Sequence, residues 1–227
     1  MKEPRILLLE TSTESCSVAL CEGTSILCER HTDTPKLQSS LLAPFVDEVL
    51  REAGLKASGC DAVAVSEGPG SYTGLRVGVS TAKGICFGAC IPLLAVNTLR
   101  VLAQAGLGQA DRIVPMIDAR RMEVYSAVFD GQTLAPLSET EAVVLDETSY
   151  AGLLAEGSVL FIGNCVEKFR PLVSSPNARF RSCCPDASAM AVPALEAWQN
   201  KEFKDVAYFE PFYLKEFVAG ISKRAVL

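Results

Sequence analysis

The side chains best placed for chemistry follow the ends of two apolar stretches. Leu9-Glu-Thr-Ser-Thr13 puts a carboxylate and three hydroxyls after the first stretch, and Gly68-Pro-Gly-Ser-Tyr-Thr-Gly74 follows the second. A glycine-rich loop that leads into a helix N-terminus attracts anions such as phosphate, because the backbone N–H groups there are unpaired. Here Leu75-Arg76 stand in place of the Lys-Ser/Thr ending of a P-loop. The pattern alone therefore leaves phosphate binding and a structural turn both open.

Two acids, Glu10 and Asp118, each end an apolar stretch. They could act as paired carboxylates, although acids in that position often cap turns instead. His31 is the only histidine, and we expect it in an exposed loop. Metal sites need clustered ligands and a Ser-His-Asp triad needs a suitably placed histidine. The sequence therefore predicts neither a metal centre nor a hydrolase triad.

The cysteines and the charge restrict the class of protein. The nine cysteines contain no Cys-x-x-Cys spacing, so we predict reduced core thiols in a cytoplasmic protein. A membrane span needs about eighteen consecutive apolar residues, and neither such a run nor a signal-peptide layout is found. The net charge of −6 and the pI near 5.0 argue against autonomous nucleic-acid binding. Small basic groups could still supplement a partner's surface, namely Arg120-Arg121, Arg179 with Arg181, and Lys223-Arg224.

The elements that must position these residues indicate an α/β fold. Glycine-rich residues 106–110 suggest a boundary between domains at 1–105 and 106–227. The apolar end of the chain, 209–217, should dock onto the body rather than dangle. The expected strands are 5–10, 16–21, 25–30, 61–65, 91–96, 112–118, 123–129, 142–145 and 159–162, and the expected helices are 35–53, 72–89, 98–105, 146–157, 166–172 and 188–199.

Two of these helices carry unusual faces. The helix 72–89 contains four glycines, each of which costs roughly 1 kcal/mol relative to alanine in a helix interior. Close approach of another backbone would offset that cost, either from the chain's own sheet or from a second subunit, and the pattern permits both. The apolar arc of the helix 35–53 covers about 180°, wider than the ~100° that packing on one sheet requires. This helix should therefore have a second covering surface.

Several motifs, in this order along the chain, resemble those of the TsaB (YeaZ) family. The Gly68–Gly78 block is the specific part, and the resemblance extends over essentially the whole chain. The supporting motifs are Leu9-Glu-Thr-Ser-Thr13, Ala82-Lys83-Gly84, Ile117-Asp-Ala-Arg120 with Glu123-Val-Tyr125, and Pro211-Phe-Tyr-Leu214.

The resemblance implies an actin-like (ASKHA) α/β fold of two RNase H-like halves, with mixed central sheets flanked by helices. The last helix could then pack back on the first half. It also implies a non-catalytic subunit of the bacterial complex that forms threonylcarbamoyladenosine in tRNA. In that family a paralogous partner, TsaD, is catalytic, a small ATPase, TsaE, joins the pair, and tRNA is reached only through the complex. Peptidase activity is not expected.

Two departures from the family's pattern bear on the site. Glu10 replaces the usual aspartate, and the stretch Gln38-Ser-Ser-Leu-Leu-Ala-Pro44 lacks a histidine. We therefore expect no catalytic or metal residue, and at most a vestigial phosphate site at Glu10, Thr11, Ser12 and Ser71. ATP or ADP is expected, if anywhere, at the interface of the complex.

The expected association surface combines the helices 35–53 and 74–89, and it could also form a homodimer of the isolated protein. Its expected residues are Leu41, Leu42, Phe45, Val49, Gly74, Gly78, Thr81, Ala82 and Ile85. The alternative is an independent actin-like ATPase or small-molecule kinase with its site between the two halves.

Overall fold

Two mixed sheets form the framework of the molecule in a computed structural model that describes residues 2–215. The first sheet has the order β3-β2-β1-β4-β5, with β1 antiparallel to β2 and parallel to β4. Its strands are β1 (Arg5–Glu10), β2 (Cys16–Glu22), β3 (Ser25–Thr32), β4 (Ala62–Gly68) and β5 (Leu93–Asn97).

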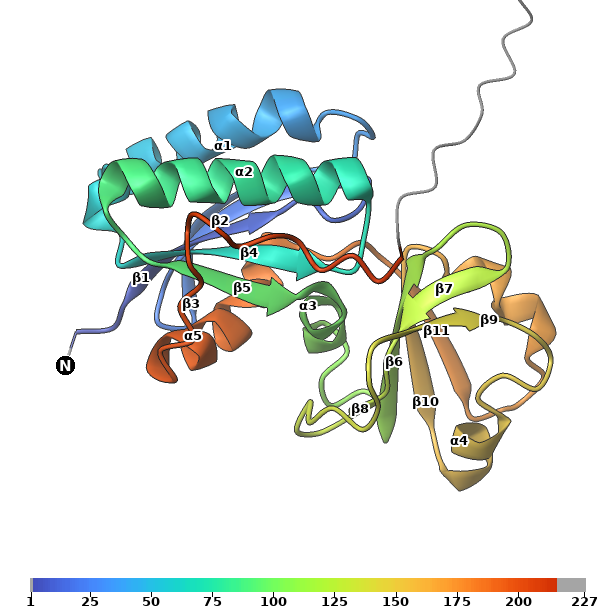
Figure 1. Cartoon of the computed structure of the whole chain (residues 1–227). Coiled ribbons are helices and arrows are strands. Elements are labelled where there is room, and N and C mark those ends of the chain that lie inside the picture. The colour runs from blue at the N-terminus through green and yellow to red at the C-terminus, as the bar shows by residue number, and fades with distance from the viewer. Residues whose placement is uncertain (1, 216–227) are drawn as a thin grey trace, which may run out of the picture.

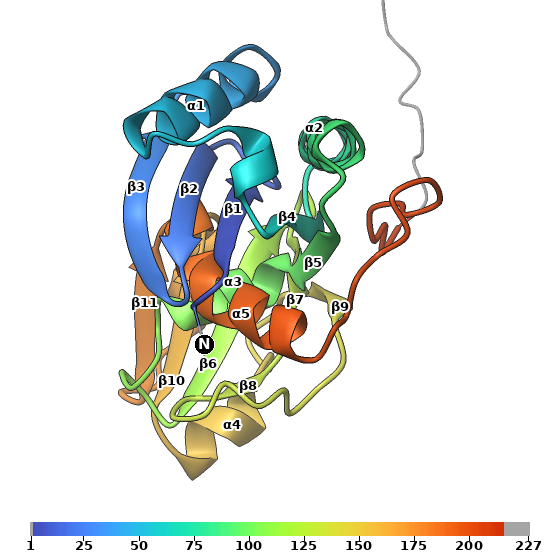
Figure 2. The same ribbon diagram turned by 90° about the vertical axis from the view of Figure 1, so that its left-hand side faces the viewer.

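Helices cover both faces of the first sheet (Figures 1 and 2). Successive residues of a strand point to opposite faces, so Leu7 and Leu9 enter one core while Ile6 and Leu8 enter the other. Because both of their faces are buried, the central strands β1 and β4 are apolar along most of their length rather than alternating. The covering helices are α1 (Gln38–Glu52) and α2 (Tyr72–Ala89) on one face, and α3 (Thr98–Gln104) and α5 (Ala191–Gln199) on the other.

The second sheet has the order β11-β10-β6-β7-β9, and β8 pairs with β6. The α3 residues Leu99 and Leu102 share a core with Ile113 and Leu160, so the two halves are joined by packing as well as by chain connection. The elements are β6 (Arg112–Asp118), β7 (Glu123–Ser126), β8 (Phe129–Asp130), β9 (Glu141–Val144), α4 (Ala151–Glu156), β10 (Val159–Gly163) and β11 (Ala178–Ser182).

The chain leaves the second sheet after β11 and returns to the first. The short 3₁₀ turn η4 (Ala187–Met190) and α5 pack against β1, β2 and β5. A further segment, residues 203–215, then runs past β5 and α2 toward the second half, and we call it the C-terminal strap (Figure 1). The division at 105/106 stays a prediction.

Specific hydrogen bonds hold the C-terminal strap. The backbone N–H of Lys204 donates to the Leu93 carbonyl at 2.8 Å, and that of Phe212 donates to the Glu67 carbonyl at 2.7 Å. Between them the Lys83 ammonium donates to the carbonyls of Ala207 and Phe209 at 3.1 and 3.0 Å. The expected docking of the end of the chain is thus seen up to residue 215, and 216–217 lie outside the described residues.

Local chemistry explains where the elements differ from expectation. The first helix begins at Gln38 rather than 35, because Lys36 adopts a φ of 68° that no helix accommodates. Pro171 lacks an N–H donor, and residues 166–172 form two 3₁₀ turns, η2 (Val166–Lys168) and η3 (Arg170–Leu172). Asp146 caps a turn, accepting from Thr148 N–H, so α4 starts only at 151.

Other differences concern strands and the histidine. β11 was not expected, and the expected strand 123–129 divides into β7 and β8. His31 is exposed as predicted but lies in β3 rather than in a loop, 2.8 Å from a carboxylate oxygen of Asp33 and of Asp186. All nine cysteines are free.

Candidate functional site

The loop between β4 and α2 is fastened to the turn that follows β1. The Ser71 hydroxyl caps α2 by accepting from the Gly74 N–H at 3.3 Å. The Ser71 N–H donates to the Ser12 carbonyl at 2.6 Å, and the Thr11 hydroxyl donates to the Gly74 carbonyl at 2.7 Å. These bonds tie the two chemically suggestive motifs of the sequence into one unit.

Two glycines of α2 are explained by this contact. A Cβ atom at Gly74 would overlap the Thr11 carbonyl oxygen, and one at Gly78 would overlap the Thr11 hydroxyl oxygen. Both glycines therefore receive the chain's own backbone and side chain, not a helix of another subunit. Their assignment to a partner surface is wrong, because their small size is required within the chain.

The remaining expected partner residues divide by burial. Leu42, Val49 and Ala82 are fully buried in the core under α1 and α2, so they too cannot face a partner directly. Leu41, Phe45, Thr81 and Ile85 stay half-exposed on the same two helices.

Two other glycines of α2 lie beside these half-exposed residues. Nothing lies within 4 Å of a Cβ position at Gly84 or Gly88. At 100° per residue they share one face of the helix with Val77, Thr81 and Ile85. We call the combined face the α1–α2 surface, and its residues are Leu41, Phe45, Val77, Thr81, Gly84, Ile85 and Gly88.

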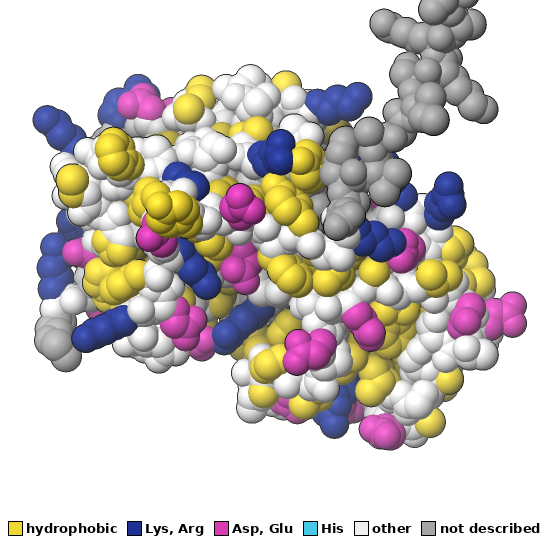
Figure 3. All heavy atoms as spheres, viewed as in Figure 1, with side chains coloured by type: hydrophobic (Ala, Val, Ile, Leu, Met, Phe, Trp, Pro, Cys, Tyr) yellow, Lys and Arg dark blue, Asp and Glu magenta, His cyan; other side chains and the backbone are white. Residues whose placement is uncertain are grey.

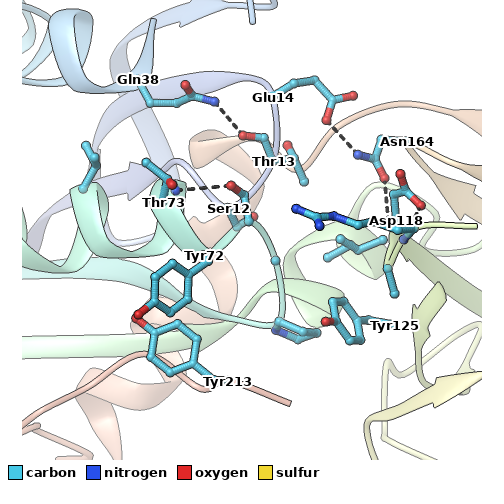
Figure 4. A pocket seen from close by; sticks show the side chains of 18 of the residues that line it. Ser12, Thr13, Glu14, Gln38, Tyr72, Thr73, Asp118, Tyr125, Asn164 and Tyr213 are labelled. Carbon is cyan, nitrogen blue, oxygen red and sulfur yellow. Dashed lines mark hydrogen bonds between the residues drawn. The ribbon is translucent and has the colours of Figure 1, made fainter. Parts of the chain in front are cut away.

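A cleft of about 790 Å³ separates the two halves near the N-termini of α1 and α2. The first half contributes residues 12–14, 35, 36, 38, 39, 69–74 and 77, and the second contributes 117–120, Tyr125 and Asn164. The end of the C-terminal strap, residues 212–215, completes the lining (Figure 4).

The four residues expected to form a phosphate site do not lie together in this cleft. Ser12 and Ser71 line it, whereas Glu10 and Thr11 are buried behind it. The Glu10 carboxylate accepts from the Ser12 N–H at 2.6 Å and from the Ser66 hydroxyl. Burial raises the pKa of this carboxyl, and the bonds from Ser12 and Ser66 oppose that rise. Glu10 is therefore a structural acid of the turn.

An amide connects the halves across the cleft. The Asn164 side chain donates to the Glu14 carboxylate at 2.8 Å and accepts from the Asp118 N–H at 3.2 Å (Figure 4). Asn164 is not among the residues expected from the sequence. The only feature that could have indicated it is its position directly after a strand that ends in glycine.

Lys168 organises the loop 118–123 on the second half. Its ammonium donates to the Asp118 carboxylate at 2.6 Å and to the carbonyls of Arg121 and Glu123 at 2.9 and 2.7 Å. The Glu123 carboxylate in turn pairs with Lys215 of the strap. Asp118, considered above as one of two paired carboxylates, is thus engaged by a lysine and lies in a different environment from Glu10.

Comparison with known proteins places the chain in a family. A family model described as TsaD, tRNA N6-adenosine threonylcarbamoyltransferase, matches residues 33–221. The tRNA threonylcarbamoyladenosine biosynthesis protein TsaB of Escherichia coli is 31% identical over 224 residues, which cover 95% of this chain and 96% of that protein. The chain belongs to the TsaB (YeaZ) family. TsaB of Haemophilus influenzae is 44% identical over 132 residues, but this alignment spans 55% of the chain and 53% of that relative.

Solved structures confirm the fold class. YeaZ from Pseudomonas aeruginosa superposes with a TM-score of 0.83 at 29% identity, covering 93% of this chain and all of that one. The (R)-2-hydroxyglutaryl-CoA dehydratase component A of Acidaminococcus fermentans, with a TM-score of 0.51 at 10% identity, shares the fold alone. This TsaB-family chain has the expected actin-like α/β fold, with two mixed sheets flanked by helices.

Among residues 2–215 the structure shows no group of three or more His, Cys, Asp or Glu side chains placed to hold a metal ion. In the same part of the chain no helix is long and apolar enough to cross a membrane.

Proposed function

We propose that this chain is a non-catalytic, cytoplasmic subunit of the complex that forms threonylcarbamoyladenosine in tRNA, and that it binds and supports a TsaD-type catalytic subunit. The names of its TsaB relatives, one of them aligned over nearly the whole chain, support a role in this biosynthesis. A TsaE-type ATPase would join the pair, and tRNA would be reached through the complex.

The observation that carries the proposal is the open glycine pair on the α1–α2 surface. A glycine in a helix interior costs about 1 kcal/mol relative to alanine, and nothing in the described chain approaches Gly84 or Gly88 closely enough to require one. Half-exposed Phe45 and Ile85 pack at the edge of the same core. This combination suits a helix of another chain that packs in near backbone contact. A second copy could occupy the same surface when the partner is absent.

The state of the acids in and behind the cleft supports a non-catalytic role. Glu10 is buried and engaged by Ser12 and Ser66, and Asp118 is held by Lys168. A general base must reach the proton that it removes, and these two carboxylates are occupied by structural partners. If ATP or ADP takes part, we assign it to the interface of the complex rather than to this chain alone.

Replacing Gly84 by leucine tests the proposal. Overpacking a tight contact typically costs 1–3 kcal/mol, and each 1.4 kcal/mol is tenfold in affinity. Binding to the TsaD-type partner, measured by titration calorimetry, should weaken about tenfold or more. The melting temperature should not fall, because the Cβ position at Gly84 is open.

Gly152→Leu is the matched control, because the Cβ position at Gly152 is also open and its helix, α4, lies in the second half, away from the α1–α2 surface. It should leave association unchanged. Unaltered partner binding by Gly84→Leu would contradict the placement of the interface. Steady-state phosphate release by the isolated chain, lost on mutating residues of the cleft, would instead favour the kinase or ATPase alternative.

A further inference from the structure

We propose that the cleft between the halves contacts RNA, with Lys36, Arg120 and Arg121 bound to backbone phosphates and an unpaired base stacked inside. The inference rests on the proposed function, because the RNA concerned is the tRNA substrate of the complex. It adds a direct contact by this chain at a defined place.

Positive charge is concentrated at the cleft opening. Lys36, Arg120 and Lys215 line the cleft, and Arg121 follows directly in the chain. Figure 3 shows Lys and Arg side chains on both sides of the junction between the halves. Although the chain as a whole has a net charge of −6, these cations are gathered at one opening. Clefts lined by one sign of charge attract ligands of the opposite sign.

Most of the neighbouring acids are neutralised by lysines. Asp118 and Glu123 pair with Lys168 and Lys215, whereas Glu14 accepts only from the neutral Asn164 amide and keeps its charge. Within residues 2–215 no hydrogen bond or ion pair involves the side-chain nitrogens of Lys36, Arg120 or Arg121, and all three residues are exposed. The free charge of the cleft opening is therefore positive.

The loop that carries both arginines is held in a fixed position. The three bonds of Lys168 hold Asp118, Arg121 and Glu123 in one arrangement. A loop ordered before binding loses less entropy when a ligand arrives. Phosphate contacts from Arg120 and Arg121 would thus be made from a preformed loop.

Aromatic rings on which a base could stack also lie in the cleft. Tyr125 and Phe212 line the same cleft, and Phe212 is 41% exposed. Proteins that bind single-stranded nucleic acid combine a cationic groove with aromatic side chains on which bases stack. A cleft of about 790 Å³ accommodates one extruded nucleotide but not a duplex. Arg121 lies outside the lining of the cleft, so the group of cations covers a longer stretch than one nucleotide bound in the cleft would occupy. This favours an RNA strand over a free nucleotide as the ligand.

The test uses the purified complex of this chain with its TsaD-type partner and unmodified tRNA, with affinity followed by fluorescence anisotropy across a salt series. Each lost phosphate contact should lower the slope of log affinity against log salt by about 1. One phosphate contact therefore strengthens binding roughly eightfold when the salt concentration falls tenfold. Arg120→Gln with Arg121→Gln, and separately Lys36→Gln, should show this change. Phe212→Ala should weaken binding without changing the slope.

Lys56→Gln with Lys201→Gln is the matched control, since both lysines are exposed and neither lines the cleft. It should bind tRNA like the wild type. Size-exclusion chromatography before RNA is added separates the two proposals. Failure of the wild-type chains to associate would overturn the proposed function, and the inference with it.

The cleft variants could instead form the complex normally and keep the wild-type affinity for tRNA and the wild-type salt dependence. That result would overturn the inference but not the proposed function. The same holds if the variants lose binding of ATP, measured by calorimetry, but keep that of tRNA. The cleft would then be a nucleotide site.

Discussion

At the scale of single residues, the turn after β1 determines much of the structure around it. Thr11 fills the space that Gly78 leaves open, and Glu10 supplies acceptors for Ser12 and Ser66. Each of these contacts can be tested by substituting either of the two residues that make it.

Gly78→Ala should lower stability by about 1–3 kcal/mol, because its Cβ would overlap the Thr11 hydroxyl oxygen. In a Thr11→Ala background the same change should be nearly neutral, since the overlapping atom is gone. Thermal melting of the wild type, the two single variants and the double variant gives the coupling free energy between positions 11 and 78. Equal losses in both backgrounds would mean that another contact excludes the side chain.

Glu10 makes stability depend on pH. Burial raises its pKa in the folded chain above the ordinary value of 4.5, so the folded state binds the proton more tightly than the unfolded state. The resulting stabilisation is complete below 4.5 and is lost as the pH rises through the raised pKa.

Glu10→Gln should therefore gain stability relative to the wild type on going from pH 5 to pH 8. Urea denaturation of both chains at the two pH values measures the difference. A gap that stays constant would show that the pKa of Glu10 does not change on folding, and a gap that moves in the other direction would show that the carboxylate is stabilised when charged.

At the scale of elements, the C-terminal strap depends on few contacts. Its central part is held by Lys83, whose ammonium donates to two strap carbonyls. The strap also reaches the cleft, where the Tyr213 ring lies 5.0 Å from that of Tyr72 and the Tyr213 hydroxyl accepts from Arg76 at 3.2 Å.

Lys83→Met should loosen the strap without unfolding the body, because the substitution removes both donors and leaves the core intact. Hydrogen exchange of the amides of 204–212 should accelerate severalfold, while the melting temperature should change little. Lys56→Met serves as the control, because Lys56 is exposed and its ammonium makes no hydrogen bond or ion pair within residues 2–215. Unchanged exchange in the Lys83 variant would show that the other contacts suffice.

At the scale of the whole molecule, sequence patterns predicted what depends on neighbours in the chain. The three opening strands and the extent of α2 follow from local apolar periodicity and from the glycine-proline break before the helix. The later start of α1 did not, because nothing nearby forces Lys36 into a positive φ.

What the sequence missed depends on residues distant in the chain. Asn164 and Glu14 are 150 positions apart, and His31 meets Asp186 across 155. The sequence of α2 shows that small residues lie along one side of the helix. It does not show which other part of the chain, or which other chain, packs against them. Thr11 settles that question for Gly74 and Gly78, and Gly84 and Gly88 stay open.

One contact of the strap also bears on the solubility of the protein. β5 is the last strand of the first sheet, and Lys204 pairs with Leu93 along its outer edge. An uncovered edge strand presents unpaired N–H and C=O groups that can template pairing with another molecule. By covering part of this edge, the strap removes a place where the apolar run 93–96 could nucleate intermolecular β-structure. A chain cut before residue 203 would thus be prone to aggregate, and it would also lose Val206 and Phe209 from the edge of the core.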